Sequence, residues 1–267
     1  MSRRTWPIII GGCHRSGTTL LRRTLNAHSR IYCGPETKFF RDFYGDYPED
    51  PLRHGRFFTS ARAVLPQDVL LELFGQAFVV FHERAALEAG KDRWADKCPE
   101  NVLYLHEWGR LLGEAWALLH VVRNPLDTLA SQKEIAFPLI LPKDIESRID
   151  LYTRYTQAGI DFGASHPDQY YLLIYEQLVT SPAQTLTNLM TWLHERYESG
   201  QLEFNSPPTQ AGLEDPKIDL TRHVHRDSVG RWSTILAEPE VNLIRSQLGG
   251  LWGSVDPDDN ASVAHWY

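Results

Sequence analysis

The chain has 267 residues, of which 42% are hydrophobic and 23% are charged, which fits one α/β domain with a substantial core. A formal net charge of −7 argues against a broad basic surface for nucleic acid, although a local cationic pocket for a small ligand is compatible with it. Because no apolar run reaches the length of a membrane-spanning helix and no signal peptide is evident, we expect a soluble, cytoplasmic protein without a membrane span.

Short apolar runs alternate with segments of helical periodicity along most of the chain. They predict strands at 7–11, 30–34, 93–97, 115–122 and 169–175, and helices at 17–28, 67–89, near 99, at 125–135, 144–165 and near 239–248. This alternation predicts a parallel sheet flanked by helices on both faces, with ligands at the carboxyl ends of the strands. Without an internal repeat or a clear linker, residues 1–267 are expected to form a single domain.

Two loop-rich segments interrupt this pattern. Residues 34–60 are rich in Tyr, Phe, Pro and Asp, and such irregular segments often carry substrate contacts. Residues 205–234 are a second loop-rich segment before the last helix. Either segment is also compatible with an ordinary surface loop.

The loop after the first strand has the spacing of a phosphate-binding loop. Gly12 is followed by four residues, Gly17, Thr18 and Thr19, which is close to the pattern GxxxxGK[ST]. Thr18 stands where that pattern has lysine, and this weakens an ATP or GTP interpretation. Backbone N–H groups and a helix N-terminus remain for an anion, and Arg15 supplies a cation. An ordinary strand-to-helix turn is the alternative for this motif alone.

The segment "LLHVVRNPLDTLASQ" predicts a second anion-binding element. Arg123 ends a buried strand, Pro125 begins a helix, and Ser131 follows eight residues after Arg123, just over two helical turns along. The two side chains are therefore able to converge on one anionic group. The alternative is an arginine at the sheet edge and a serine that faces solvent.

Together, these segments resemble the nucleotide-binding elements of sulfotransferases that use 3′-phosphoadenosine 5′-phosphosulfate. The chain is most similar to the protein-tyrosine sulfotransferases and their bacterial relatives, because "GGCHRSGTTLLRRTLNAH", "CGPETKFF", "DKCPEN", "VVRNPLDTLAS" and "IYEQLVTSP" occur in the same order. The resemblance covers roughly residues 7–195. It implies a sulfotransferase-like fold, a donor bound without metal, and adenosine 3′,5′-bisphosphate as the product. The residues that it assigns to the nucleotide are Arg15, Ser16, Gly17, Thr18, Thr19, Arg123, Ser131 and Tyr175.

The resemblance also assigns catalytic roles to Arg15, Glu36 and Lys97. Glu36 would take the proton of the acceptor hydroxyl, while Lys97 and Arg15 would stabilise the oxygens of the transferred and departing groups. Taken alone, Glu36 reads as a solvated loop glutamate and Lys97 as a surface lysine before a helix. Other branches use a histidine as the base, so His54, His106 and His120 remain alternatives.

Two further sets of residues are expected around the site. "RDSVGRW" is similar to the loop that covers the nucleotide in these enzymes, although the lysine after its tryptophan is missing and the serine expected two residues before it is replaced by glycine; the candidates are Ser228, Gly230, Arg231 and Trp232. Lys38 and Arg41, beside two phenylalanines, are candidates for a cationic and aromatic acceptor entrance. The alternative for that stretch is a helix start with both phenylalanines in the core.

These observations predict transfer of a sulfuryl group to a hydroxyl of a carbohydrate, a small molecule or a peptide tyrosine. A P-loop small-molecule kinase and a non-catalytic nucleotide-binding module are the alternatives. Three cysteines without metal-binding spacing predict reduced buried thiols, and no metal ligand set is evident among the eleven histidines. The oligomeric state is open, with a homodimer as one candidate.

Overall fold

The computed structural model describes residues 5–45, 56–134, 141–203 and 223–256. Within them, five strands form one sheet in the order β2-β3-β1-β4-β5, and each neighbouring pair is parallel. The strands are β1 (Ile8–Gly11), β2 (Ile31–Cys33), β3 (Arg93–Lys97), β4 (Ala117–Val122) and β5 (Tyr170–Ile174). The parallel α/β fold predicted from the sequence is thereby confirmed.

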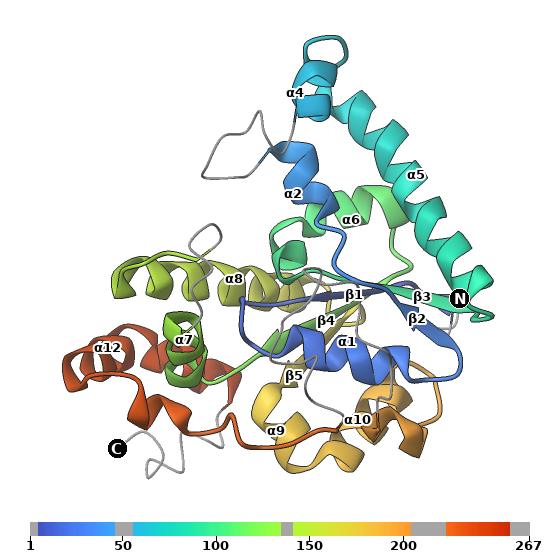
Figure 1. Ribbon diagram of the computed structural model, residues 1–267. Coiled ribbons are helices and arrows are strands. Elements are labelled where there is room, and N and C mark those ends of the chain that lie inside the picture. The colour runs from blue at the N-terminus through green and yellow to red at the C-terminus, as the bar shows by residue number, and fades with distance from the viewer. Residues whose placement is uncertain (1–4, 46–55, 135–140, 204–222, 257–267) are drawn as a thin grey trace.

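Helices cover both faces of the sheet (Figure 1). One face packs against α1 (Thr18–Asn26), α9 (Tyr175–Thr180) and α10 (Pro182–Trp192). The other packs against α5 (Gln67–Glu88), α6 (Leu105–Leu112), α7 (Pro125–Glu134), α8 (Ile145–Ser165) and α12 (Glu238–Val255). Ile8 and Ile10 belong to the first core and Ile9 to the second, as the alternation of side chains along a strand requires.

The central strands are apolar because both of their sides are buried. All six residues of β4 are buried, and β1 lies between β3 and β4 with Ile8 to Ile10 fully inaccessible. β2 and β3 lie on one side of β1, and β4 and β5 lie on the other. The strand order therefore changes direction at β1, which opens a crevice at the carboxyl ends of β1 and β4. This edge carries the loop at residues 12–17 and Arg123.

Several helices differ from the sequence prediction. The segment at 34–60 contains two short helices, α2 (Phe39–Tyr44) and α4 (Arg56–Arg62), while residues 46–55 lie outside the described residues. Such helices are too short to show a periodic pattern, and α2 is held by the buried side chains of Phe40 and Phe43.

The remaining differences concern element ends and type. The helix predicted near residue 99 begins as a 3-10 helix, η2 (Pro99–Leu103), and two further short 3-10 helices are η3 (Ser199–Leu202) and η4 (Arg231–Thr234). The sequence prediction did not assign α9 and α10. Helix α12 continues beyond the predicted end at 248, through two glycines, because Trp252 and Val255 pack in the core and this packing overrides the weak helix propensity of glycine.

Candidate functional site

The loop between β1 and α1 forms a cradle for an anion. A Cβ at Gly12 would lie 2.2 Å from the Val121 carbonyl oxygen, and a Cβ at Gly17, where φ is +100°, would lie 2.3 Å from the Tyr175 ring. Only glycine fits so close to neighbouring backbone and ring atoms. Ser16 is fully buried, and its Oγ has no hydrogen-bond partner among the described residues. An unsatisfied hydroxyl in a glycine-containing loop at a helix N-terminus fits a phosphate oxygen.

Arg15, Arg123, Ser131 and Tyr175 come together beside this cradle. Arg15 Nε donates to Ser131 Oγ at 3.2 Å, and Arg123 Nη1 donates to the Arg15 carbonyl oxygen at 3.2 Å. The Arg123 guanidinium lies 4.7 Å from the centre of the Tyr175 ring, and its buried Nε has no partner among the described residues. Two cations and a hydroxyl therefore face one place, as the predicted second anion-binding element requires.

Glu36 and Lys97 are in direct contact at the same edge of the sheet. Lys97 ends β3 and is 1% exposed; its Nζ donates to Glu36 Oε1 and, at 2.9 Å, to Thr19 Oγ1 in the first turn of α1. The Glu36 side chain keeps 20% of its surface exposed. A carboxylate that opens to solvent is thus placed beside an ammonium group that also contacts the first turn of α1.

Lys38 and Arg41 lie in different environments. Lys38 Nζ is 4.0 Å from Glu36 Oε2. Lys38 has a left-handed backbone with φ of +52°, which is uncommon for residues other than glycine. Arg41 is buried and donates to Glu100 Oε1 at 3.0 Å. Phe40 is buried in the core at the start of α2, so the helix-start alternative describes this stretch and the Arg41 charge is paired.

Glu100 is a buried carboxylate that sequence reasoning missed. Besides Arg41, it meets His14 Nε2 at 3.4 Å and accepts from Cys98 Sγ at 2.8 Å. Burial alone would raise the pKa of Glu100, but the nearby His14 and the hydrogen bonds from His14 and Cys98 outweigh burial and hold that pKa well below its usual range. His14 lies inside the loop at 12–17, so this anion joins η2 to the phosphate cradle.

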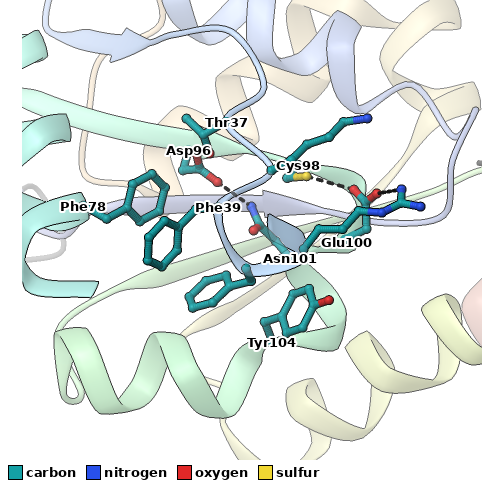
Figure 2. Close-up of a pocket in the computed structure, with 11 residues that line it drawn as sticks. Thr37, Phe39, Phe78, Asp96, Cys98, Glu100, Asn101 and Tyr104 are labelled. Atoms are coloured by element: carbon teal, nitrogen blue, oxygen red, sulfur yellow. Dashed lines mark hydrogen bonds and ion pairs between the residues drawn. The ribbon is translucent and has the colours of Figure 1, made fainter. Parts of the chain in front are cut away.

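Asp96, also missed, holds the residue next to Glu36. It is 2% exposed and accepts from Thr37 Oγ1 at 3.1 Å and from Asn101 Nδ2 at 2.9 Å, and it lies 3.2 Å from His82 Nε2. Burial opposes its charge, yet hydrogen bonds from His82, Asn101 and Thr37 lower the pKa of Asp96. Figure 2 shows Thr37 and Asp96 on one side of a small hollow and the rings of Phe39 and Phe78 on another.

That hollow is small. Its volume is about 10 Å³, enough for about one water molecule, between the polar groups of Thr37, Asp96 and Asn101 and four aromatic rings. The aromatic side is formed by Phe39, Phe40, Phe78 and Tyr104. The hollow therefore reads as packing around the Asp96 network and not as a volume that holds a whole substrate.

The candidates at 228–232 divide into two groups. The Ser228 carbonyl oxygen accepts from Arg123 Nη2, which brings Ser228 into the site, and Gly230 makes a left-handed turn with φ of +78°. Arg231 pairs with Glu134 at 2.7 Å, and the Trp232 ring faces the Arg245 guanidinium at 5.4 Å, so neither side chain points at the other candidates. The predicted loop residues 205–222 lie outside the described residues.

Of the histidine alternatives for the base, the two that lie in the described residues, His106 and His120, are not in the site. His120, on β4, is fully buried, and its ring lies against Gly159 of α8. Its Nδ1 makes a 2.9 Å hydrogen bond with Tyr170 Oη, and burial lowers its pKa to about 3. His106 is on the surface helix α6, and His54 lies outside the described residues. His14, which the sequence analysis did not single out, lies beside Arg15 in the loop at 12–17.

The three cysteines are free and buried, as predicted. Burial raises the pKa of the Cys13 thiol to about 12 and that of Cys98 well above its usual value, so neither is a reactive thiolate. Among the described residues, no group of three His, Cys, Asp or Glu side chains is arranged to hold a metal ion. None of the helices in the described ranges has the length and apolarity needed to cross a membrane.

Comparison with known proteins gives a consistent picture. A model of the sulfotransferase family matches residues 7–199. An uncharacterized protein of Aquifex aeolicus (strain VF5) is 25% identical over 233 residues, which cover 85% of this chain but 30% of that protein. The chain thus spans less than a third of the length of this relative.

Solved structures share the fold at low sequence identity. The sulfotransferase domain of the olefin synthase from Synechococcus PCC 7002 superposes with a TM-score of 0.62 at 19% identity, covering 90% of this chain and 93% of that one. Mouse sulfotransferase SULT7A1, solved in complex with PAP, superposes with a TM-score of 0.50 at 11% identity, covering 99% of this chain and 89% of that one. Similarity at this level supports the architecture.

Proposed function

This chain belongs to the sulfotransferase family, whose model matches residues 7–199, and from that premise we propose that it transfers a sulfuryl group from 3′-phosphoadenosine 5′-phosphosulfate to an acceptor hydroxyl. The observation that carries the proposal is the convergence of three sets of side chains at one edge of the sheet. These are the loop at 12–17, the pair Arg123 and Ser131, and the pair Glu36 and Lys97.

The residues present fit such a donor. The unpartnered Ser16 Oγ and the glycines whose Cβ atoms would collide with their surroundings form a cradle for the 5′-phosphosulfate. The unpartnered Nε of Arg123, with Ser131 nearby, fits the 3′-phosphate. Thr18 in place of the P-loop lysine favours this donor over ATP. PAP was found bound to mouse SULT7A1, which has the same overall fold.

Each catalytic candidate has a task that its position supports. When bound, the donor supplies the sulfuryl group and leaves as adenosine 3′,5′-bisphosphate. Glu36, partly exposed, accepts the proton of the acceptor hydroxyl. Lys97 and Arg15 place positive charge where negative charge develops on the oxygens of the departing phosphate and of the transferred group. Lys97, fixed between Glu36 and Thr19, keeps that charge in place without reorganisation.

The proposal extends to the setting of the reaction. The acceptor is a carbohydrate, a small molecule or a peptide tyrosine, and Lys38 beside Glu36 is the first candidate to contact it. The chain acts as one catalytic domain. Three free buried thiols fit a reducing, cytoplasmic environment.

Titration calorimetry with adenosine 3′,5′-bisphosphate, adenosine 5′-monophosphate and ATP, with and without magnesium, tests the donor. We expect magnesium-independent binding that requires the 3′-phosphate. A preference for magnesium-ATP would indicate a kinase, and no nucleotide binding by folded protein would overturn the proposed donor.

Transfer of ³⁵S from the labelled donor to a phenol, a primary alcohol, a sugar and a tyrosine peptide then tests the reaction. We expect Glu36→Gln to retain nucleotide affinity and to lose turnover. Full turnover in that variant would remove Glu36 from the role of base.

A further inference from the structure

Residues 223–236, the covering segment, lie against the candidate nucleotide site. Ser228 contacts it directly, since its carbonyl oxygen accepts from Arg123 Nη2. Burial raises the pKa of Tyr175, and the charge of Arg123 and a hydrogen bond with the Ser228 side chain counteract that shift. The covering segment therefore touches the two residues that line the predicted 3′-phosphate end of the site.

The backbone of the covering segment bonds other backbone groups only locally among the described residues. Between residues 226 and 236 these backbone-to-backbone hydrogen bonds include those from Val229 N to the Arg226 oxygen and from Leu236 N to the Trp232 oxygen. Gly230 turns the chain with φ of +78°. Attachment of this segment to the body of the protein therefore depends on side chains. Leu236 is buried in the core with Trp232 and Ile235 packed against it, and polar side chains of the body bond the backbone of the segment.

Asp127, in the first turn of α7, provides that attachment. It is 3% exposed, and its two carboxylate oxygens accept from two backbone N–H groups of the covering segment, Gly230 N at 2.7 Å and Trp232 N at 3.0 Å. Its Oδ2 is also 3.9 Å from Arg123 Nη2. Hydrogen bonds to an ionised acceptor are about twice as strong as neutral ones, and burial protects them from water and salt.

A second charged contact to the same segment is the natural comparison. Arg231 pairs with Glu134 on the last turn of α7 at 2.7 Å, but their side chains are 42% and 27% exposed. Solvent-exposed ion pairs contribute little to stability. Removing the charge of the buried Asp127 should therefore loosen the covering segment, whereas removing the charge of the more exposed Glu134 should have little effect.

We propose that Asp127 is a positioning residue that fixes the covering segment over the 3′-phosphate end of the nucleotide site. The same helix start then sets Arg123, Ser131 and the covering segment relative to one another before the nucleotide arrives. This inference rests on the proposed function, because it assumes that a 3′-phosphorylated nucleotide binds between Arg123 and Tyr175.

Calorimetric titration of the full chain, with Asp127→Asn and Glu134→Gln as the matched pair, tests it. Asparagine keeps the shape of the side chain but offers one acceptor oxygen, and its NH₂ group would face the other backbone N–H. We expect Asp127→Asn to weaken adenosine 3′,5′-bisphosphate binding about tenfold and adenosine 5′-monophosphate binding less than threefold. Glu134→Gln should change both less than twofold. Hydrogen exchange of residues 226–236 should quicken in ligand-free Asp127→Asn alone.

The possible results separate the two proposals. Unchanged bisphosphate affinity and unchanged exchange in folded Asp127→Asn would overturn the inference, as would equal losses for both nucleotides or equal effects of both substitutions. No bisphosphate binding by the wild-type chain would instead overturn the proposed donor, and the exchange result would still decide the attachment.

If Asp127→Asn does not fold, Gly230→Ala serves as the second variant. Its Cβ would meet no atom of the described residues within 4 Å, so among them only the left-handed backbone that presents the N–H group is strained. The same selective loss of bisphosphate affinity is expected, and its absence would contradict the inference.

Discussion

Replacing Thr37 by valine tests whether the residue beside Glu36 must be held by Asp96. Valine has nearly the shape of threonine, so the substitution removes the 3.1 Å hydrogen bond to Asp96 Oδ1 without opening a cavity. Asp96 is 2% exposed and keeps Asn101 and His82 as partners, so its charge remains compensated in part. The perturbation is therefore confined to one donor on a buried anion.

The expected magnitude follows from that single bond. A hydrogen bond to a charged group contributes about 1.5–3 kcal/mol, which corresponds to a melting temperature lower by roughly 3–12 °C in a domain of this size. Glu36 precedes Thr37 in the chain, and Lys38, which follows Thr37, holds a strained left-handed backbone, so loss of the anchor should displace Glu36. A displacement of about 1 Å costs about a hundredfold in rate.

Thermal unfolding and ³⁵S transfer measure the two effects on Thr37→Val and on Thr37→Ser, which keeps the hydroxyl. Turnover of Thr37→Val should fall 10- to 100-fold at unchanged bisphosphate affinity, with serine within about threefold of wild type. Slow hydrolysis of the donor by water gives the same comparison without an acceptor. Wild-type stability and turnover in Thr37→Val would refute the reasoning, and an equal defect in Thr37→Ser would show that the hydroxyl is not the cause.

Three other substitutions probe separate parts of the site. Burial raises the pKa of Glu176 from 4.5 to about 7, so its contribution to stability is complete below pH 4.5 and is lost as pH rises through 7. The stability of Glu176→Gln relative to wild type should therefore rise by up to about 3 kcal/mol between thermal melts at pH 5 and at pH 8. Gly17→Ala should abolish nucleotide binding through collision with Tyr175, whereas Gly90→Ala, also left-handed but in open space, should cost only about 1–2 kcal/mol of stability; equal outcomes in denaturation and calorimetry would contradict this. Arg123→Lys should recover part of the bisphosphate affinity that Arg123→Ala loses, since lysine keeps the charge without the planar fork, and wild-type affinity in the alanine variant would exclude the site.

The parallel sheet was predictable because its strands are buried on both sides. The run at 117–122 is apolar except for His120, and all six of its residues are buried. Helices α2 and α4 were not predictable, because six or seven residues carry too few turns for a periodic pattern, and the aromatic side chains of α2 find their partners on α5 and α6. Tertiary packing, not local propensity, decides such short elements.

The clustering of candidate residues was predictable where a residue lies at or soon after the end of a strand. Lys97 ends β3, Arg123 follows β4 and Arg15 lies in the loop after β1, and parallel strands bring such ends to one edge. Glu100 and Asp127 were not predictable in this way, because each lies in the first turn of a helix. Acidic residues are favoured at that position in any helix, so neither stands out in the sequence. Arg41 is 59 residues from Glu100 and Gly230 is 103 residues from Asp127, and no spacing rule links residues so far apart.

Two pairs of consecutive residues explain how Glu36, the proposed base, is fixed by so short a loop. Glu36 and Thr37 are consecutive, and so are Lys97 and Asp96, whose side chains leave β3 toward opposite faces because strand residues alternate. Lys97 reaches α1 through Thr19, whereas Asp96 reaches α5 through His82. The loop after β2 is thus tied to both layers of the domain at once, and a helix movement on either face would be transmitted to Glu36.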